Sequence, residues 1–309
     1  MNSHRSQAGL SPIGAKALSP GRLAQLACVL EVLAPKPGNV QRHRDLPGLH
    51  LLDFIASALA IGEPLDRARA EGIGAAVEQA VEATRRMVST NTNLGMVLLL
   101  APLAAVPAGD DLREGVASVL AATTVEDSRA VYRAIRLAQP GGMGSVPDQD
   151  VASEPTLPLV DVMTLAADRD LVARQYADGF REVFDDALPA LLGSLAAGHP
   201  IETAIVAAHL TLLSRHPDSL IARKAGVEAA AEVSRRAGKL LSAGWPDRSG
   251  SARQLDELDA WLRDPGRRLN PGTSADLVTA ALFGALRSGT ISPCVIPTSS
   301  VLVSSGRFS

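Results

Sequence analysis

Residues 269–277 form a turn that leads directly into a helix, and they read Leu269-Asn270-Pro271-Gly272-Thr273-Ser274-Ala275-Asp276-Leu277. Pro271 fixes its own φ and Gly272 has a permissive backbone, as a tight turn requires. Thr273 or Ser274 is expected to cap the helix. Asp276, three residues after Thr273, then completes a capping box with Asp in place of Glu. The stretch predicts a turn followed by a helix, and this pattern repeats along the chain.

The predicted helix start is also a candidate anion site. Backbone N–H groups in the first turn of a helix have no partners within the helix, so they can bind a phosphate. Two interpretations stay open at this point. The stretch is either only a well-made helix start or one wall of a binding site, and the rest of the chain decides between them.

The composition of the 309 residues favours packed helices. The chain is 46% hydrophobic but only 3% aromatic, so its core has to be built from Ala, Leu, Val and Ile. The net charge of −3 lacks the basic field that nucleic-acid binding needs, and we expect no nucleic-acid partner. Cys28 and Cys294 cannot staple a fold of this size and are expected to be free thiols in a reducing cytosol.

Helical signals recur along almost the whole chain, and we find no alternating strand pair with a hairpin turn. The short connections predict one compact all-α domain over residues 20–289, between loose tails at 1–19 and 290–309, with the site formed by inter-helix loops. The expected helices are Pro20–Ala34, Leu49–Ala60, Pro64–Ser89, Leu94–Val106, one capped by Asp110 or Asp111, one capped by Thr124 with Asp127, Leu159–Ala167, Leu171–Leu195, Pro200–Ser214, Ser219–Ala243, Ser251–Leu262 and Ser274–Arg287.

The most apolar run of the chain is Leu94–Val106. It is too short to span a bilayer and contains Pro102, so we interpret it as a buried helix. The first 20 residues lack the continuous apolar segment of an export signal. We therefore expect a cytoplasmic protein with no membrane partner, and a homodimer is one assembly open to it.

Polar residues in the loops between apolar helices build a site in an all-α fold, because helix ends converge there. The loop after the first helix places Lys36 between two prolines, and a cation held in a stiff segment suits a phosphate. His43 and Asp45, later in the same loop, are expected to orient each other for acid–base chemistry. The alternative is a helix stop followed by a solvated charged loop.

Two further loops carry polar or flexible residues. Thr90-Asn91-Thr92-Asn93 stands before the apolar helix, where it either binds phosphate or ribose hydroxyls or only caps the helix. Residues 140–145 are rich in glycine and precede Asp148, Asp150 and Glu154, which suits a close backbone approach and Mg²⁺. The glycine stretch is neither a Walker A loop nor a Rossmann fingerprint.

Two charged segments complete the set of loops. We interpret Asp168-Arg169-Asp170 as a structural ion pair at a helix junction. Asp218 is expected to cap a helix whose first two turns hold Arg223 and Lys224, and cations there oppose the helix dipole unless a bound polyphosphate offsets the cost. The chain has no His-Glu-x-x-His, Cys-x-x-Cys or Gly-x-Ser-x-Gly pattern, which argues against zinc sites and serine hydrolases.

These loops, in this order, resemble the triphosphoribosyl-dephospho-CoA synthase family over roughly residues 24–286. The matching segments are Glu31-Val32, Lys36-Pro37-Gly38, Arg42-His43-Arg44-Asp45 before Asp53-Phe54, residues 91–95, residues 218–226 and residues 270–277. The resemblance implies an all-α enzyme that breaks the bond between the adenine and the ribose of ATP. The 5-triphosphoribosyl group is then transferred to the 2′-hydroxyl of 3′-dephospho-CoA.

The resemblance also implies roles for single residues. Glu31 stabilises the positive charge that builds on the sugar, and His43 or Asp45 accepts the proton of the attacking hydroxyl. Asp45 and Asp276 hold the Mg²⁺ that accompanies ATP. The residues implied in binding the substrates are Lys36, Asn39, Asn91, Thr92, Asn93, Arg223, Lys224, Asn270, Gly272, Thr273 and Ser274.

The chain departs from the citrate lyase type of this family at two points. It has Asn93-Leu94 where those members carry His-Lys, and residues 223–226 read Arg-Lys-Ala-Gly where those members carry Arg-Gly-Gly. It is more similar to a divergent branch, whose members also occur alongside tetrahydromethanopterin-linked one-carbon enzymes and whose acceptor is placed near residues 148–170. The alternatives to a transferase are a Mg²⁺-dependent nucleotide hydrolase and a non-catalytic nucleotide-binding helical protein.

Overall fold

The computed structural model describes residues 18–142, 144–267 and 269–292, and all its named elements are helices, as predicted. The predicted tails, and Cys294 with them, fall almost wholly outside the described residues. The elements are α1 (Pro20–Leu33), α2 (Leu51–Ala60), α3 (Gly62–Glu71), α4 (Ile73–Met87), α5 (Leu94–Ala105), α6 (Leu112–Ala121), α7 (Val125–Ala138), α8 (Leu159–Thr164), α9 (Leu171–Ala177), the π-helical turn η1 (Val183–Ala187), α10 (Leu188–Ala196), α11 (Ile201–Arg215), α12 (Ser219–Ala225), α13 (Val227–Ser242), α14 (Ser251–Arg263) and α15 (Gly272–Arg287).

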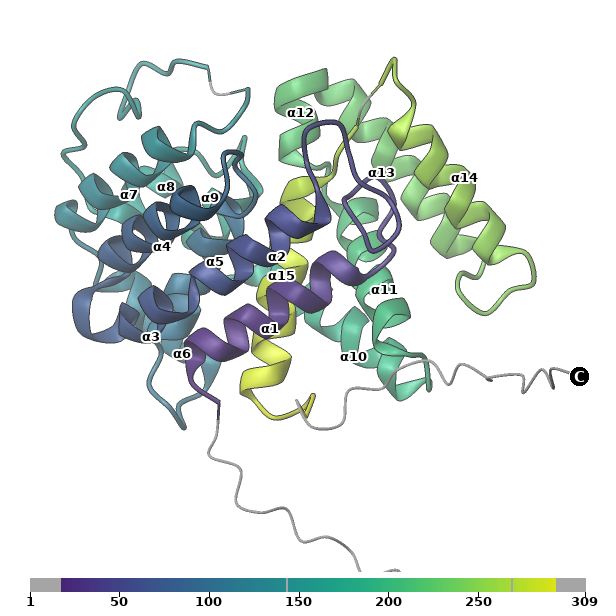
Figure 1. Cartoon of the computed structure of the whole chain (residues 1–309), viewed down its shortest axis with the longest axis horizontal. Coiled ribbons are helices and arrows are strands. Elements are labelled where there is room, and N and C mark those ends of the chain that lie inside the picture. The colour runs from purple at the N-terminus through teal and green to yellow at the C-terminus, as the bar shows by residue number, and fades with distance from the viewer. Residues whose placement is uncertain (1–17, 143, 268, 293–309) are drawn as a thin grey trace, which may run out of the picture.

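Helix α15 runs through the middle of the molecule (Figure 1). All its residues from Leu277 to Leu286 are buried, and α1, α5, α10, η1 and α11 pack around it. Every residue of α5 except Gly95 is buried too, which confirms the predicted buried helix. Helices that are apolar on all sides are stable only when other helices enclose them. No helix in the described part of the chain has the length and apolar character to cross a membrane.

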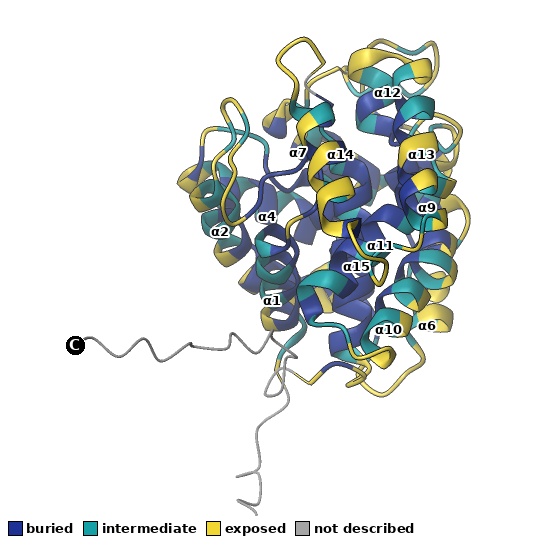
Figure 2. Ribbon diagram, turned by 90° about the vertical axis from the view of Figure 1, so that its right-hand side faces the viewer, coloured by how far each residue is buried: buried dark blue, intermediate teal, exposed yellow. Residues whose placement is uncertain are grey.

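The apolar side chains form two clusters. The larger one gathers α1 to α11 around α15, and the smaller one lies between α11, α12, α13 and α14. Buried residues occupy the centre of the molecule around α11 and α15, whereas the outer face of α14 is exposed (Figure 2). Because α11 contributes to both clusters, the two halves share one continuous helical framework.

Three long helices that the sequence predicts are each broken in two or more pieces. Pro64–Ser89 is interrupted at Gly72, Leu171–Leu195 near Gly179, and 219–243 at Gly226. These glycines have φ of 92°, 62° and 93°. A positive φ ends a right-handed helix, and only glycine adopts it readily. An isolated glycine is tolerated inside a helical pattern, so the sequence pattern alone does not show these breaks.

Two of the predicted helix caps are confirmed. The Asp111 side chain accepts hydrogen bonds from the first-turn N–H groups of α6. Thr124 and Asp127 form the predicted capping box of α7, in which each side chain bonds to the backbone of the other residue. Local sequence therefore determines these two helix starts.

Candidate active site

One cavity of about 530 Å³ lies where the ends of α1, α5, α12 and α15 meet α7, α8 and α9. Lys36, His43, Asp45 and Ser274 are not among its lining residues. The predicted site residues that do line it are Glu31, Asn39, Asn91, Thr92, Asn93, Arg223, Lys224, Asn270, Gly272, Thr273 and Asp276. The structure therefore brings together four segments that are far apart in the sequence.

The start of α15 is capped from another helix. Pro271 is the N-cap residue and forms no side-chain cap, so the predicted caps by Thr273 or Ser274 with Asp276 are wrong. Instead, Asp218 Oδ2 accepts hydrogen bonds from the backbone N (2.8 Å) and the Oγ (2.9 Å) of Ser274. A carboxylate of the protein itself thus occupies part of the anion site that the helix start predicts.

The same Asp218 carboxylate also caps α12. Its Oδ1 accepts hydrogen bonds from the N–H groups of Leu220 and Ile221, both at 3.0 Å, as predicted. Asp218 is 0% exposed, and burial raises the pKa of its carboxyl while these hydrogen bonds oppose the shift. One buried side chain therefore joins the first turns of two helices whose ends line the cavity.

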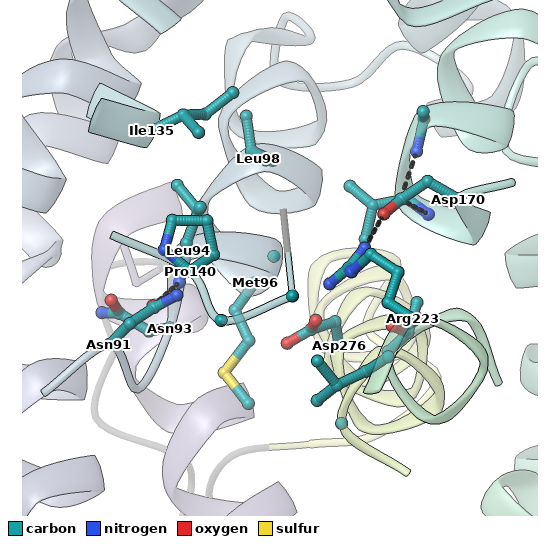
Figure 3. A pocket seen from close by; sticks show the side chains of 18 of the residues that line it. Asn91, Asn93, Leu94, Met96, Leu98, Ile135, Pro140, Asp170, Arg223 and Asp276 are labelled. Atoms are coloured by element: carbon teal, nitrogen blue, oxygen red, sulfur yellow. Dashed lines mark hydrogen bonds and ion pairs between the residues drawn. The ribbon is translucent and has the colours of Figure 1, made fainter. Parts of the chain in front are cut away.

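Asp276 faces the cavity instead of capping its own helix (Figure 3). Gly95 of α5 makes room for it, because a Cβ at Gly95 would lie 2.0 Å from Asp276 Oδ2. Burial in the cavity wall raises the pKa of Asp276 well above its usual range, and the Glu31, Asp218 and Asp170 carboxylates raise it further. Such a concentration of carboxylates attracts a cation or a proton.

Arg223 and Lys224 lie in the last turn of the short helix α12. The negative end of the helix dipole stabilises cations in the last turn, so the predicted electrostatic cost of these two residues is absent. The prediction was wrong because it took α12 and α13 as one helix, and Gly226 separates them. Both side chains nevertheless line the cavity and supply it with positive charge.

Asp170 lines the cavity, although the sequence analysis interpreted it only as part of a structural ion pair with the adjacent Arg169. It forms an ion pair with Arg223 across the cavity wall (Figure 3), and not with the adjacent Arg169. Its Oδ1 caps α9 through the N–H groups of Val172 (2.9 Å) and Ala173 (3.1 Å). The available signal was its N-cap position directly before an apolar helix.

His43 and Asp45 lie on an exposed loop and are not among the residues that line the cavity. The predicted mutual orientation of the two is wrong, because Asp45 contacts His50 Nδ1 at 3.1 Å and accepts a hydrogen bond from the N–H of Leu51 at 2.8 Å. These two hydrogen bonds, the backbone one first, lower the pKa of Asp45. Asp276 lines the cavity and Asp45 does not.

The loop before α5 holds its polar side chains in a dense hydrogen-bond network. Asn91 accepts from the N–H of Leu94 (3.2 Å), and Asn93 donates to Thr84 Oγ1 (3.0 Å). Thr92 shares a hydrogen bond with Ser57. Only the Asn91 contact reaches the first turn of α5, because the N-cap residue Asn93 makes no side-chain cap and Thr92 and Asn93 bond to other helices. All three residues also form part of the cavity surface.

The wall formed by α7, α8 and α9 is largely apolar. It includes Val131, Ile135, Val162, Met163 and Val172. Nothing in the sequence singles these residues out, because an aliphatic side chain at helical spacing reads as ordinary core. The cavity thus joins a charged region to an apolar one, which suits a ligand with both characters.

No group of three or more His, Cys, Asp or Glu side chains is arranged to hold a metal within the residues that the structure describes. Asp276 lines the cavity together with Glu31, Asp150 and Asp170, but these carboxylates do not form such a group. This arrangement fits Mg²⁺ that arrives bound to a nucleotide, because Mg²⁺ is usually held by one or two carboxylates together with substrate phosphates and water. It does not fit a metal held by the protein alone.

Comparisons with known proteins match this chain to a family. Residues 17–292 match the model of the ATP:dephospho-CoA triphosphoribosyl transferase family. A Stutzerimonas stutzeri protein named a probable 2-(5″-triphosphoribosyl)-3′-dephosphocoenzyme-A synthase is 30% identical over 277 residues, which cover 85% of this chain and 90% of that protein. The corresponding synthase of Pectobacterium atrosepticum is 38% identical over 102 residues, and this match spans only 33% of this chain and 32% of that protein's length.

A solved structure agrees with these matches. The crystal structure of an Archaeoglobus fulgidus protein, which its title names a putative triphosphoribosyl-dephospho-CoA synthase, superposes with a TM-score of 0.59 at 28% identity, over 76% of this chain and 99% of that one. The family match covers α1 to α15, including every segment that lines the cavity. The chain therefore belongs to the ATP:dephospho-CoA triphosphoribosyl transferase family.

Proposed function

We propose that this protein transfers the 5-triphosphoribosyl group of ATP to a hydroxyl of 3′-dephospho-CoA, or of a related cofactor precursor, and releases adenine. The observation that carries the proposal is that Glu31 and Asp276 line the same cavity as the cations Arg223 and Lys224. Such a cavity provides a carboxylate for a sugar that becomes positively charged and cations for a triphosphate that stays intact.

The charged region of the cavity is the site for the triphosphate. Lys224 is exposed toward solvent at the rim, and the buried Nε of Arg223 has no hydrogen-bond partner within the described structure. A phosphate oxygen would satisfy this N–H, because guanidinium groups bind phosphate through several donors at once. Asp276 would contact the Mg²⁺ that accompanies the triphosphate, which supplies most of the remaining ligands.

The chemistry takes place at C1 of the ribose. The bond from C1 to the adenine nitrogen breaks, a bond from C1 to the acceptor oxygen forms, and the hydroxyl loses its proton. Glu31 would stabilise the positive charge that develops on the sugar. Because His43 and Asp45 do not line the cavity, we assign the hydroxyl proton to a carboxylate of the cavity wall, Glu31 or Asp276. The departing adenine nitrogen takes up one proton, so that one proton is lost and one is gained in the reaction.

Separation of the products formed from ATP, Mg²⁺ and 3′-dephospho-CoA tests this proposal. We expect free adenine to appear only when enzyme and acceptor are both present. Adenine without an acceptor product would point to another acceptor hydroxyl. ADP, AMP or inorganic phosphate as the product would instead indicate a nucleotide hydrolase, and unchanged ATP with saturable binding would indicate a non-catalytic protein.

Gly95→Ala is expected to lower kcat/KM for adenine release by roughly 10- to 100-fold, because small displacements of site groups have effects of this size. The added methyl group would lie 2.0 Å from Asp276 Oδ2 and would force the carboxylate to move. Gly193→Ala is the matched control, since a Cβ at this helical glycine meets nothing within 4 Å. Steady-state kinetics of both variants decide the point, and equal activities would show that the position of Asp276 does not matter.

A further inference from the structure

Lys36 lies behind the cavity wall and not in it. Its side chain is 0% exposed, whereas Glu31, at the end of α1, lines the cavity. The Lys36 Nζ lies 2.9 Å from Glu31 Oε1. The ammonium group therefore acts on the cavity only through the carboxylate that it contacts.

All the hydrogen-bond donors of this ammonium are engaged. Besides Glu31 Oε1, Nζ donates to the main-chain oxygen of Glu31 and to that of Ala34 at 3.4 Å. A lysine ammonium has three N–H donors and no acceptor, so these three oxygens use its full capacity. No donor is left for a phosphate.

The position of Lys36 also follows from the way α1 ends. The last carbonyls of a helix have no partners within the helix, and the negative end of the helix dipole favours a cation there. Pro35 and Pro37 stop the helix and turn the chain back, so that the Lys36 side chain reaches these carbonyls. The stiff segment that the sequence shows thus directs the cation to the helix end.

The Lys36 side of the pair is closed to water. His209 of α11 is 0% exposed, and burial together with the charge of Lys36 lowers its pKa to about 3, which leaves the ring neutral. Burial also raises the pKa of Glu31 and lowers that of Lys36, while the attraction between the two opposes both shifts. The attraction between Glu31 and Lys36 therefore offsets much of the cost of burying each charge.

We propose that Lys36 is a positioning residue, which fixes the Glu31 carboxylate at the end of α1 for the reacting sugar and does not contact the triphosphate. The catalytic part of this inference rests on the proposed function, and the pairing rests on the structure alone. A carboxylate that stabilises a developing charge has to be held in place before the reaction, and a buried partner provides this.

The variant Lys36→Met removes the charge and keeps the length of the side chain. We expect it to lower kcat for adenine release by about 100-fold and to leave the Kd for Mg-ATP, measured by calorimetry, unchanged. Lys224→Met is the matched control, because Lys224 is an exposed cation that does line the cavity. It is expected to raise the Kd for Mg-ATP about tenfold, the effect of one lost charge-assisted contact.

A rise of the Kd in Lys36→Met that equals the rise in Lys224→Met would overturn the proposal, because it would make Lys36 a phosphate ligand. Thermal unfolding supplies a test that needs no activity. Lys36→Met leaves the Glu31 carboxylate buried and unpaired, so we expect a lower unfolding temperature, and the double variant Glu31→Gln/Lys36→Met should recover most of the loss. Additive effects of the two substitutions would contradict the pairing.

These two measurements separate the inference from the function on which it rests. If the wild-type protein released no adenine, the proposed function would fail. The unfolding experiment would still show whether Lys36 serves Glu31, and the Mg-ATP titration would still show whether it binds phosphate.

Discussion

Asp276→Asn is expected to lower kcat for adenine release by about 100-fold or more and to leave the protein at least as stable as the wild type. The amide has nearly the same shape as the carboxylate, so it still fits against Gly95. It carries no charge, however, and therefore binds Mg²⁺ and a proton poorly. Removal of a charge close to Glu31, Asp218 and Asp170 also relieves repulsion, which supports stability.

Two readouts check this expectation. Adenine release is followed at increasing Mg²⁺ concentration, and thermal unfolding is compared with the wild type. Asp256→Asn, at an exposed position of α14, is the matched control and should change neither. If Asp276→Asn keeps its activity with an unchanged dependence on Mg²⁺, Asp276 is not a metal ligand.

Asp218→Ala is expected to lower the free energy of unfolding by about 3–5 kcal/mol. The substitution removes the partner of three backbone N–H groups, at Leu220, Ile221 and Ser274, and of the Ser274 hydroxyl. These groups are buried or partly buried, so water does not readily replace the lost carboxylate. The loss separates α12 from α15, and activity should fall with stability.

Denaturant unfolding of a second cap variant provides the comparison. Asp111 caps only α6, through two N–H groups at an exposed position, and its replacement by alanine should cost about 1 kcal/mol. The difference between the two variants measures what the double cap of Asp218 adds. Similar losses for both would show that Asp218 is an ordinary N-cap and does not join the two helices.

The sequence predicted the fold class and most helices because both depend on local patterns. Apolar residues at helical spacing and capping residues such as Asp111 and Thr124 act within a few residues of one another. The helices that were predicted as continuous but are broken in the structure end at single glycines, whose backbone conformation the hydrophobic pattern does not indicate. Gly72 and Gly226 could have continued a helix by their sequence pattern, but each has a positive φ, which ends it.

The site was predicted as a set of loops but not as a set of contacts. The order of the loops led to the family, and most of the residues expected to bind substrate do line one cavity. Their hydrogen-bond and ion-pair partners are determined by tertiary structure. Asp218 and Ser274 are separated by 56 residues, and Asp170 and Arg223 by 53. Rules that consider only neighbouring residues therefore predicted Asp276 as a helix cap and paired Asp170 with Arg169.

Lys36 and the apolar wall illustrate two further limits. A lysine between two prolines gives the same local sequence pattern whether its side chain faces a cavity or the end of its own helix. Only the structure shows that Lys36 contacts Glu31. The apolar residues of α7 and α8 have the same spacing as core residues, and only the structure identifies them as part of the cavity wall.

The mass of the acceptor product tests the central claim most directly. The enzyme is incubated with Mg²⁺, 3′-dephospho-CoA and ATP that carries an isotopic label in its γ-phosphate, and the products are separated and weighed by mass spectrometry. We predict one acceptor product that has gained a triphosphoribosyl group with the label retained, together with an equal amount of free adenine. Label in inorganic phosphate or pyrophosphate, with ADP or AMP in place of adenine, would contradict the account.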